Sequence, residues 1–124
     1  MDDADHEEMA PQGERLVVSK LSCSLAGQRE TVRLLPGTLA RRAYGRAEAV
    51  EDYRCSYGLN PAFRARIVCG GLVVSGVGEG GEARVVELPG HRFYVATLYV
   101  PQLTSTPQAS HPLVVAYLRA ALGM

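Results

Sequence analysis

The sequence has little of three features that would assign a class of function directly. Only 3 of its 124 residues are cysteine, and they form no CxxC pair. An odd, sparse set of cysteines argues against a disulfide framework and favours a reducing cytoplasm as the location. No apolar run approaches the roughly 20 residues of a membrane span, and the first residues are acidic, unlike a signal peptide. We therefore expect no membrane partner.

Net charge is also absent, because 13 basic side chains balance 13 acidic ones. No overall field steers the chain toward nucleic acid, so we expect no nucleic-acid partner. The charge is nevertheless segregated, since five of the first eight residues are acidic. We interpret residues 1–13 as an acidic flexible tail, with an intramolecular clamp as the alternative, and residues 14–124 as one folded domain. A domain of this size buries a modest core, which favours a partner subunit.

One apolar stretch, RFYVATLYVPQLTST (92–106), dominates the second half of the chain. Apolar side chains alternate onto both of its faces, which predicts a central strand covered on both sides. Pro101 has no N–H to donate and ends this strand. Open α/β sheets bind ligands beyond the carboxyl ends of their strands, so Val100, Gln102 and Ser105 are candidate substrate-binding residues.

The remaining elements are short and separated by turn residues. Thr38 and Asn60-Pro61 predict helix starts, and Gly45 and Gly123 predict helix ends. We expect strands over 16–25, 31–35, 47–57, 72–76 and 83–88, and helices over 39–44, 61–69 and 113–122. The first two strands suggest a hairpin. This order predicts an α+β fold with a mainly antiparallel or mixed sheet and a few helices.

Cofactor signals are weak. The cysteines have no nearby histidine pattern, so we expect no metal site. Gly78, Gly80 and Gly81 lack the strand-to-helix context and the lysine of a phosphate loop. We therefore expect no cofactor.

Several polar side chains stand out in apolar surroundings. Glu87 lies in the strand VVELP, where it either points to solvent, the favoured interpretation, or is buried as an acid. Tyr53, Tyr57 and Tyr99 add aromatic surface with hydroxyl groups, which suits a pocket for an organic molecule and equally suits a core.

Several segments resemble, in order, the end of the glutaminase domain of CTP synthase, a class I glutamine amidotransferase. The resemblance is closest to its smaller relatives, the CTP synthase C-terminal region-related proteins. The segments that carry it are LSCSLAG (21–27), LLPGT (34–38), YRCSYGLNP (53–61) and ATLYVPQLTSTP (96–107). The resemblance implies a truncated class I glutamine amidotransferase-like domain.

The resemblance does not carry over the activity. A class I glutaminase needs a cysteine thiolate, a histidine base and an acid that orients it. The nucleophile belongs to the first half of the family's domain, for which this chain shows no equivalent segment. The family's histidine and glutamate correspond to Val100 and Gln102, and an arginine that holds glutamine corresponds to Ser56. The resemblance therefore implies a protein that does not hydrolyse glutamine by itself.

Other residues near the lost site are candidates for replacement chemistry. Cys55 lies in a strand that borders the glutamine site in the family, although a thiol there is more often a small apolar filler. The resemblance also implies that Cys23 can approach Cys55. Our catalytic candidates are Cys55, Glu87 and Arg54, and our substrate-binding candidates are Tyr53, Tyr57, Tyr99, Val100, Gln102 and Ser105.

These observations leave three functions open. The first is a retired glutaminase-like domain that binds, and in a specialised pathway transforms, a small organic molecule. The second is a non-enzymatic interaction or scaffold subunit, and the third is a glutaminase half that works only with a partner chain. Half a domain leaves an apolar edge to be covered, so we expect a homodimer first and a separate chain with the missing half second.

Overall fold

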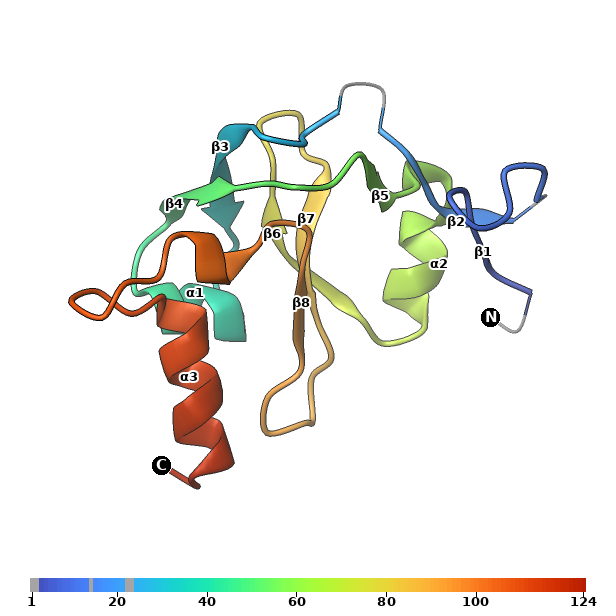
Figure 1. The fold of residues 1–124 in the computed structure, drawn as a ribbon. Helices are drawn as coiled ribbons and strands as arrows, with labels where there is room; N and C mark the ends of the chain where they lie inside the picture. The colour runs from blue at the N-terminus through green and yellow to red at the C-terminus, as the bar shows by residue number, and fades with distance from the viewer. Residues whose placement is uncertain (1–2, 14, 22–23) are drawn as a thin grey trace.

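A computed structural model describes residues 3–13, 15–21 and 24–124. These residues form two sheets with three α-helices (Figure 1). The larger sheet has the order β4-β3-β6-β7-β8 and the smaller one β1-β2-β5. The strands are β1 (Asp5–His6), β2 (Leu16–Lys20), β3 (Arg29–Leu34), β4 (Glu48–Asp52), β5 (Tyr57–Leu59), β6 (Val73–Val77), β7 (Ala83–Glu87) and β8 (Val95–Thr97). The helices are α1 (Leu39–Tyr44), α2 (Arg64–Cys69) and α3 (Pro112–Ala121), with 3₁₀ turns η1 (Pro61–Phe63) and η2 (Pro101–Leu103).

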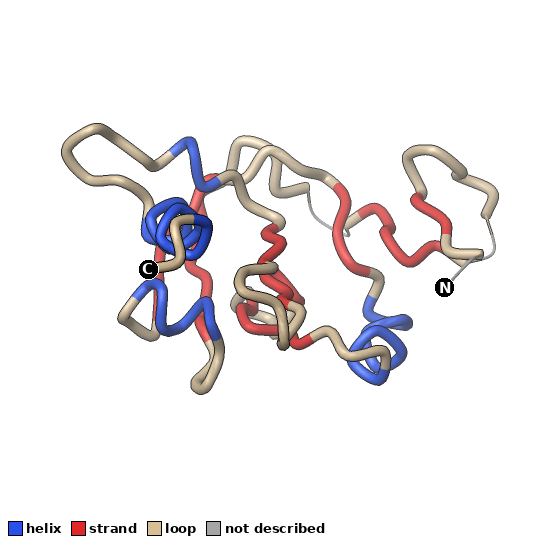
Figure 2. Tube along the Cα trace, turned by 90° about the horizontal axis from the view of Figure 1, so that it is seen from below, coloured by secondary structure: helices blue, strands red, loops and turns tan. Residues whose placement is uncertain are grey.

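All pairs in the larger sheet are antiparallel, whereas the smaller sheet contains one parallel pair, β1 with β2. The expected α+β class with a mainly antiparallel or mixed sheet is confirmed. Helices α1 and α3 lie together at one side of the larger sheet, while α2 and the smaller sheet lie at the other (Figures 1 and 2). The two chain ends are consequently at opposite ends of the molecule.

The core fills the space between the larger sheet and the two helices beside it. Val32, Leu34 and Val85 are each at most 1% exposed there. Gly76 of β6 allows the closest approach, because an added Cβ would lie 2.6 Å from a methyl group of Val85. Burial of this apolar surface is the main stabilising term.

The short-range signals in the sequence are confirmed. Thr38 accepts a hydrogen bond from the Arg41 amide at 3.1 Å, and Gly45 ends α1 in the left-handed region with a φ of 69°. Asn60 accepts from the Ala62 amide at 3.0 Å and so begins η1. The β6–β7 hairpin turns at residues 78–81, where Gly81 has a φ of +87°. These are interactions within a few residues, which local sequence determines.

Two expectations about strand pairing are wrong. The first two long strands do not form a hairpin, because β2 pairs with β5 in the smaller sheet while β3 pairs with β4 and β6. The expected strand over 47–57 is split into β4 and β5, since the Leu21 amide donates to the Ser56 carbonyl and draws that end of the segment toward β2. Pairing partners are chosen by tertiary packing, which alternation does not report.

The apolar stretch 92–100 is not a central strand. Its ordered part, β8, pairs only with β7 among the described residues and is therefore an edge of the sheet. Tyr94 is 50% exposed, so the N-terminal part of the stretch is not covered as expected, whereas Tyr99 near its other end is 2% exposed. On α3, which follows this stretch, the apolar side chains of Tyr117 and Leu118 are 54% and 53% exposed.

The acidic segment lies against β2 over its described part. Asp5 and His6 form β1 beside β2, and the Glu7 carboxylate accepts a hydrogen bond from the Lys20 amide at 2.9 Å. Cys23 lies outside the described residues, and so does its expected approach to Cys55.

Candidate functional site

The three substrate-binding candidates that follow Tyr99, namely Val100, Gln102 and Ser105, have no ionisable side chain. Val100 is half-buried, and its amide donates to the Asp52 carbonyl at 3.1 Å. Gln102 is exposed on η2, and the Ser105 hydroxyl accepts from the His111 amide at 2.9 Å. None of these three side chains is a proton acceptor that could serve as a general base.

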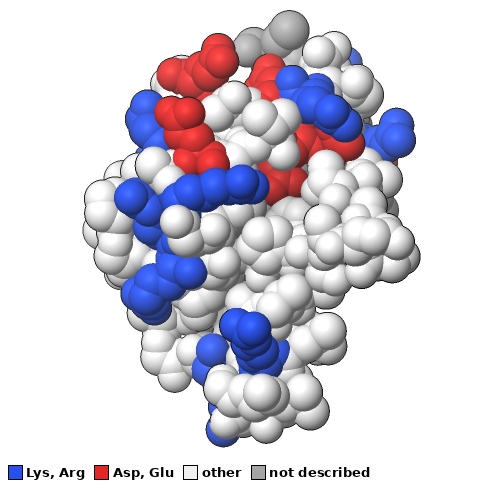
Figure 3. Space-filling model, turned by 90° about the vertical axis from the view of Figure 1, so that its left-hand side faces the viewer, with Lys and Arg blue, Asp and Glu red and all other residues white. Residues whose placement is uncertain are grey.

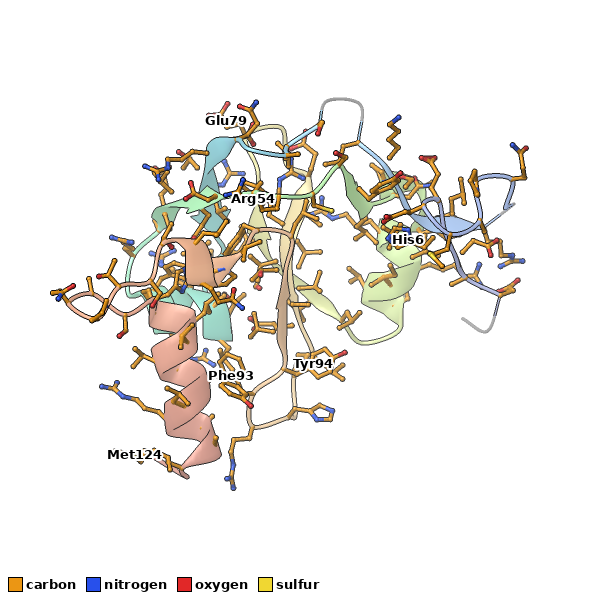
Figure 4. All side chains as sticks on the ribbon, in the orientation of Figure 1. His6, Arg54, Glu79, Phe93, Tyr94 and Met124 are labelled. Carbon is orange, nitrogen blue, oxygen red and sulfur yellow. The ribbon has the colours of Figure 1, made fainter. Side chains whose placement is uncertain are left out.

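The tyrosine candidates separate into two environments. Tyr53 and Tyr99 are 1% and 2% exposed, and their rings meet edge to face with centroids 5.7 Å apart. They belong to the core. Tyr57 and Cys55 are half-buried neighbours, and the Cys55 thiol donates to the Tyr57 carbonyl at 3.1 Å. Arg54 is exposed on the link between β4 and β5 (Figure 4).

Glu87 is buried, so the favoured expectation that it points to solvent is wrong. It is 7% exposed and both of its carboxylate oxygens are used. One accepts from the Leu39 amide at 2.8 Å and the other from the Ala40 amide at 3.1 Å. These amides begin α1, where negative charge is favourable. Glu87 therefore fastens α1 to β7, and neither oxygen is free for a substrate.

A network of buried side-chain hydrogen bonds surrounds Glu51 of β4. We call it the Glu51 cluster, and its members are Tyr44, Glu51, Tyr99, Thr104 and His111. Glu51 is 2% exposed and His111 4%. The His111 Nε2 lies 2.8 Å from the Glu51 carboxylate, and the Tyr44 hydroxyl donates to the same carboxylate. Thr104 donates to its other oxygen at 3.4 Å. The cluster joins α1, β4, the segment after β8 and the start of α3.

The hydrogen bonds assign the protons of this cluster. The Leu113 amide donates to His111 Nδ1 at 3.1 Å, so Nδ1 is an acceptor and Nε2 carries the hydrogen that points to Glu51. Since Tyr44 donates to Glu51, the Tyr99 hydroxyl, 2.9 Å away, donates to the Tyr44 oxygen. Every donor has an acceptor, so the cluster is a closed structural network.

None of the sequence-derived candidates except Tyr99 belongs to this cluster. His111 also caps α3, because its Nδ1 accepts a hydrogen bond from the Leu113 amide. The alternation of β4 placed Glu51 on the same face as Ala49 and Tyr53, which are buried. A carboxylate among apolar residues on one strand face was the available signal, but nothing local identifies partners 60 residues away.

Burial raises the pKa of three core tyrosines. Burial raises the pKa of Tyr53 to about 12, although the positive charge of Arg84 opposes this rise. The pKa of Tyr44 rises further because of burial, the neighbouring Tyr99 and its hydrogen bonds to Glu51 and Tyr99. The pKa of Tyr99 also rises, because burial outweighs the hydrogen bond with Tyr44, which lowers it. A group with a raised folded pKa contributes stability that is present below its unfolded pKa, about 10 for tyrosine, and is lost as pH increases through the folded value.

We therefore expect the protein to lose stability progressively above about pH 10. The near-ultraviolet phenolate absorbance should show a late component that coincides with loss of the far-ultraviolet circular dichroism signal. Tyr99→Phe is the control variant, since it removes one late phenolate while retaining the ring. Complete titration of all six tyrosines before unfolding would contradict the burial of the three.

Two larger cavities lie elsewhere in the molecule. A shallow groove of about 580 Å³ between α1 and α3 includes Arg42, Arg92 and Arg119, and it lies on the side where basic side chains gather (Figure 3). A cavity of about 380 Å³ lies between the smaller sheet and the β6–β7 hairpin. None of the sequence-derived site residues lines either of these cavities, and Gln102 lines a smaller one of about 200 Å³ beside α3. The described residues contain no group of three potential metal ligands and no helix long and apolar enough to cross a bilayer.

Comparison with known proteins gives one consistent result. The chain is 41% identical to CTP synthase of Sulfurisphaera tokodaii over 71% of its own length, and 37% identical to CTP synthase of Frankia casuarinae over 96%. It spans only about a fifth of the length of these relatives, 17% and 22% respectively. No family model matches the chain.

The fold is also that of a known domain. The chain superposes on the Trypanosoma brucei CTPS glutaminase domain with bound acivicin with a TM-score of 0.91 and 24% identity, covering 98% of this chain and 52% of that one. The sequence relatives and this fold agree on the resemblance first seen in the separated segments. The chain is therefore a CTP synthase glutaminase-like C-terminal region protein with the class I glutamine amidotransferase fold.

Proposed function

We propose that this chain is a glutaminase-like domain that no longer hydrolyses glutamine and binds a small organic molecule instead. The observation that carries the proposal is the pair of residues after β8. Val100 and Gln102 occupy the positions at which the family resemblance implies a histidine base and a glutamate. Valine takes up no proton, and an amide carries no charge to stabilise a protonated base. Ser56 occupies the position at which the family resemblance implies a glutamine-binding arginine. Its hydroxyl oxygen lies 2.7 Å from the hydroxyl oxygen of Ser24.

The decisive experiment is an ammonia-release assay on the purified protein with glutamine. We expect no release above the uncatalysed background, and we expect native mass spectrometry of the same sample to reveal a retained small molecule. Release of ammonia at an enzymic rate would overturn the proposal. We also propose a cytoplasmic location, because the small, odd number of cysteines suits a reducing compartment.

An interaction role is the second candidate, and it is favoured by one apolar surface. We call it the α3–β8 face and define it by Phe93, Tyr94, Val95, Ala96 and Tyr117, which line a hollow of about 320 Å³ with no charged residue. Phe93 extends from the β7–β8 turn on the side of α3, and Tyr94 extends from the other side of the turn (Figure 4). The centroids of the Phe93 and Tyr117 rings lie 5.6 Å apart.

A second copy of this chain is the partner that we propose for this face. An uncharged surface meets its own copy without like-charge repulsion, and the free edge of β8 can pair with the same edge of another copy about a two-fold axis. A glutaminase half completed by a separate chain is the weaker alternative. A partner chain could supply the missing nucleophile, but it could not change Val100 of this chain into a base.

We expect sedimentation velocity to show a dimer that Tyr117→Lys converts to a monomer, because the added ammonium would be buried without a counter-charge. Val68→Lys on α2 is the matched control, since Val68 is similarly exposed, 46%, on the other side of the molecule. A monomeric wild-type protein would contradict the homodimer and favour a separate partner chain. If the Tyr117→Lys variant remained dimeric, the dimer interface would have to lie on another surface.

A further inference from the structure

The cavity of about 380 Å³ between the two sheets has an unusual lining. One wall comes from the smaller sheet and the helix after it, with Leu21, Leu59 and Pro61 as apolar surface. The other wall comes from the β6–β7 turn and the start of β7. Its size is within the usual range for small-molecule sites, which extends from about 300 to 1,000 Å³.

Arg84 forms the buried end of this cavity. Along β7, Val85 faces the core and Glu87 faces α1, so alternation places Arg84 on the opposite side, toward the smaller sheet. Its side chain is only 8% exposed. Burying a guanidinium is costly unless its donors are hydrogen-bonded and its charge is paired.

Those requirements are not met among the described residues. The Arg84 Nε is buried without a hydrogen-bond partner. The nearest carboxylate oxygen, on Glu82, lies 4.0 Å from Nη2, and Glu82 is 48% exposed. The guanidinium carbon lies 5.9 Å from the ring centroid of Tyr53, whose hydroxyl is also buried without a partner. A guanidinium only donates hydrogen bonds, so the missing group is an acceptor.

The surrounding charges point the same way. Lys20, Arg64 and Arg84 line the cavity together with a single carboxylate, Glu82. Arg64 is held at the rim because its Nη1 donates to the Gly81 carbonyl at 2.6 Å. Three cations against one anion at a partly enclosed site favour a negatively charged ligand.

We propose that this cavity binds a small organic anion whose carboxylate or phosphate group accepts hydrogen bonds from Arg84. Both anions match the fork of donors on a guanidinium. The apolar body of the ligand packs against Leu21 and Leu59. This inference rests on the proposed small-molecule role and assigns it a site, a set of residues and a class of ligand.

Binding of phenyl phosphate, phenylacetate and neutral phenylacetamide to the purified protein tests the proposal by isothermal titration calorimetry and ligand-observed NMR. We expect at least one of the two anions to bind, more weakly as salt is added, and phenylacetamide not to bind. The two anions show whether the site prefers a phosphate or a carboxylate.

The variants identify the site. Arg84→Gln should weaken binding by about tenfold or more, since a charged hydrogen bond is lost, and Lys20→Gln by a smaller factor. Arg66→Gln is the matched control, because Arg66 is an exposed arginine of α2 that does not line the cavity. Circular dichroism checks that each variant is folded. If Arg84→Gln does not fold, the Lys20→Gln variant still tests the site, because Lys20 is exposed and its substitution should not disturb the fold.

Two results would overturn the inference. One is the absence of anion binding, which would mean that water alone accepts hydrogen bonds from the buried Arg84 donors. The other is equal binding by Lys20→Gln, Arg84→Gln and Arg66→Gln. Neither result involves glutamine hydrolysis, so a failure here is distinguishable from a failure of the proposed loss of glutaminase activity.

Discussion

Glu51→Ala is expected to lower the free energy of unfolding by about 4 kcal/mol, the largest effect of any single change we consider. The substitution leaves His111 Nε2–H and the Tyr44 hydroxyl without their acceptor in a space where both residues are at most 8% exposed. Water cannot replace the carboxylate without opening the contact between α1 and α3. The measurement is equilibrium denaturation in urea, followed by circular dichroism.

Two further variants sharpen this prediction. Glu51→Gln keeps the volume and one acceptor but points an amide N–H₂ at existing donors, so we expect a loss of about 2 kcal/mol. Glu48→Ala is the control on the same strand, because Glu48 is exposed, and it should cost less than about 0.5 kcal/mol. Equal urea midpoints for Glu51→Ala and Glu48→Ala would show that the Glu51 cluster contributes nothing to stability.

Glu87→Ala is expected to lower the free energy of unfolding by about 3 kcal/mol, because it removes two charge-assisted hydrogen bonds at the start of α1. The Ala40 amide is then unsatisfied in a fully buried position, since Ala40 is 0% exposed. The cap by Thr38 remains, so α1 should persist while its attachment to β7 weakens. Urea denaturation measures the loss, and amide hydrogen exchange of Leu39 and Ala40 locates it.

The control for Glu87 is Glu79→Ala in the β6–β7 turn, where the carboxylate is exposed. We expect its stability to be within about 0.5 kcal/mol of the wild type. If Glu87→Ala denatured at the same urea concentration as Glu79→Ala, Glu87 would not be a structural residue. The catalytic role considered from the sequence would then deserve a new test.

The two buried carboxylates show where local sequence reasoning ends. Both lie on strands with apolar neighbours, and both are recognisable as exceptions to the pattern. Their partners are 47 and 60 residues away, on α1 and at the start of α3. Alternation reports which face of a strand a side chain occupies, but it does not report which element covers that face.

The end of β8 shows the opposite case. The absence of an ionisable side chain at Val100 and Gln102 is a property of the residue types, so it needed no structure. The expected strand was nevertheless assigned the wrong position in the sheet, because an edge strand with exposed apolar side chains can have the same apolar alternation as a central strand.

Residue identity by itself determined the helix caps, the hairpin turn, the relationship to CTP synthase and the uncharged residue types at Val100 and Gln102, because each depends on side-chain chemistry or on contacts within a few positions. Only the tertiary structure decided that β2 and β3 enter different sheets, that Glu51 accepts hydrogen bonds from three side chains of other segments, and that the Arg84 Nε is buried without an acceptor among the described residues. The physical reason is that these features are sums of long-range contacts. Their free energies depend on which distant surfaces meet, and short sequence windows contain no record of that choice.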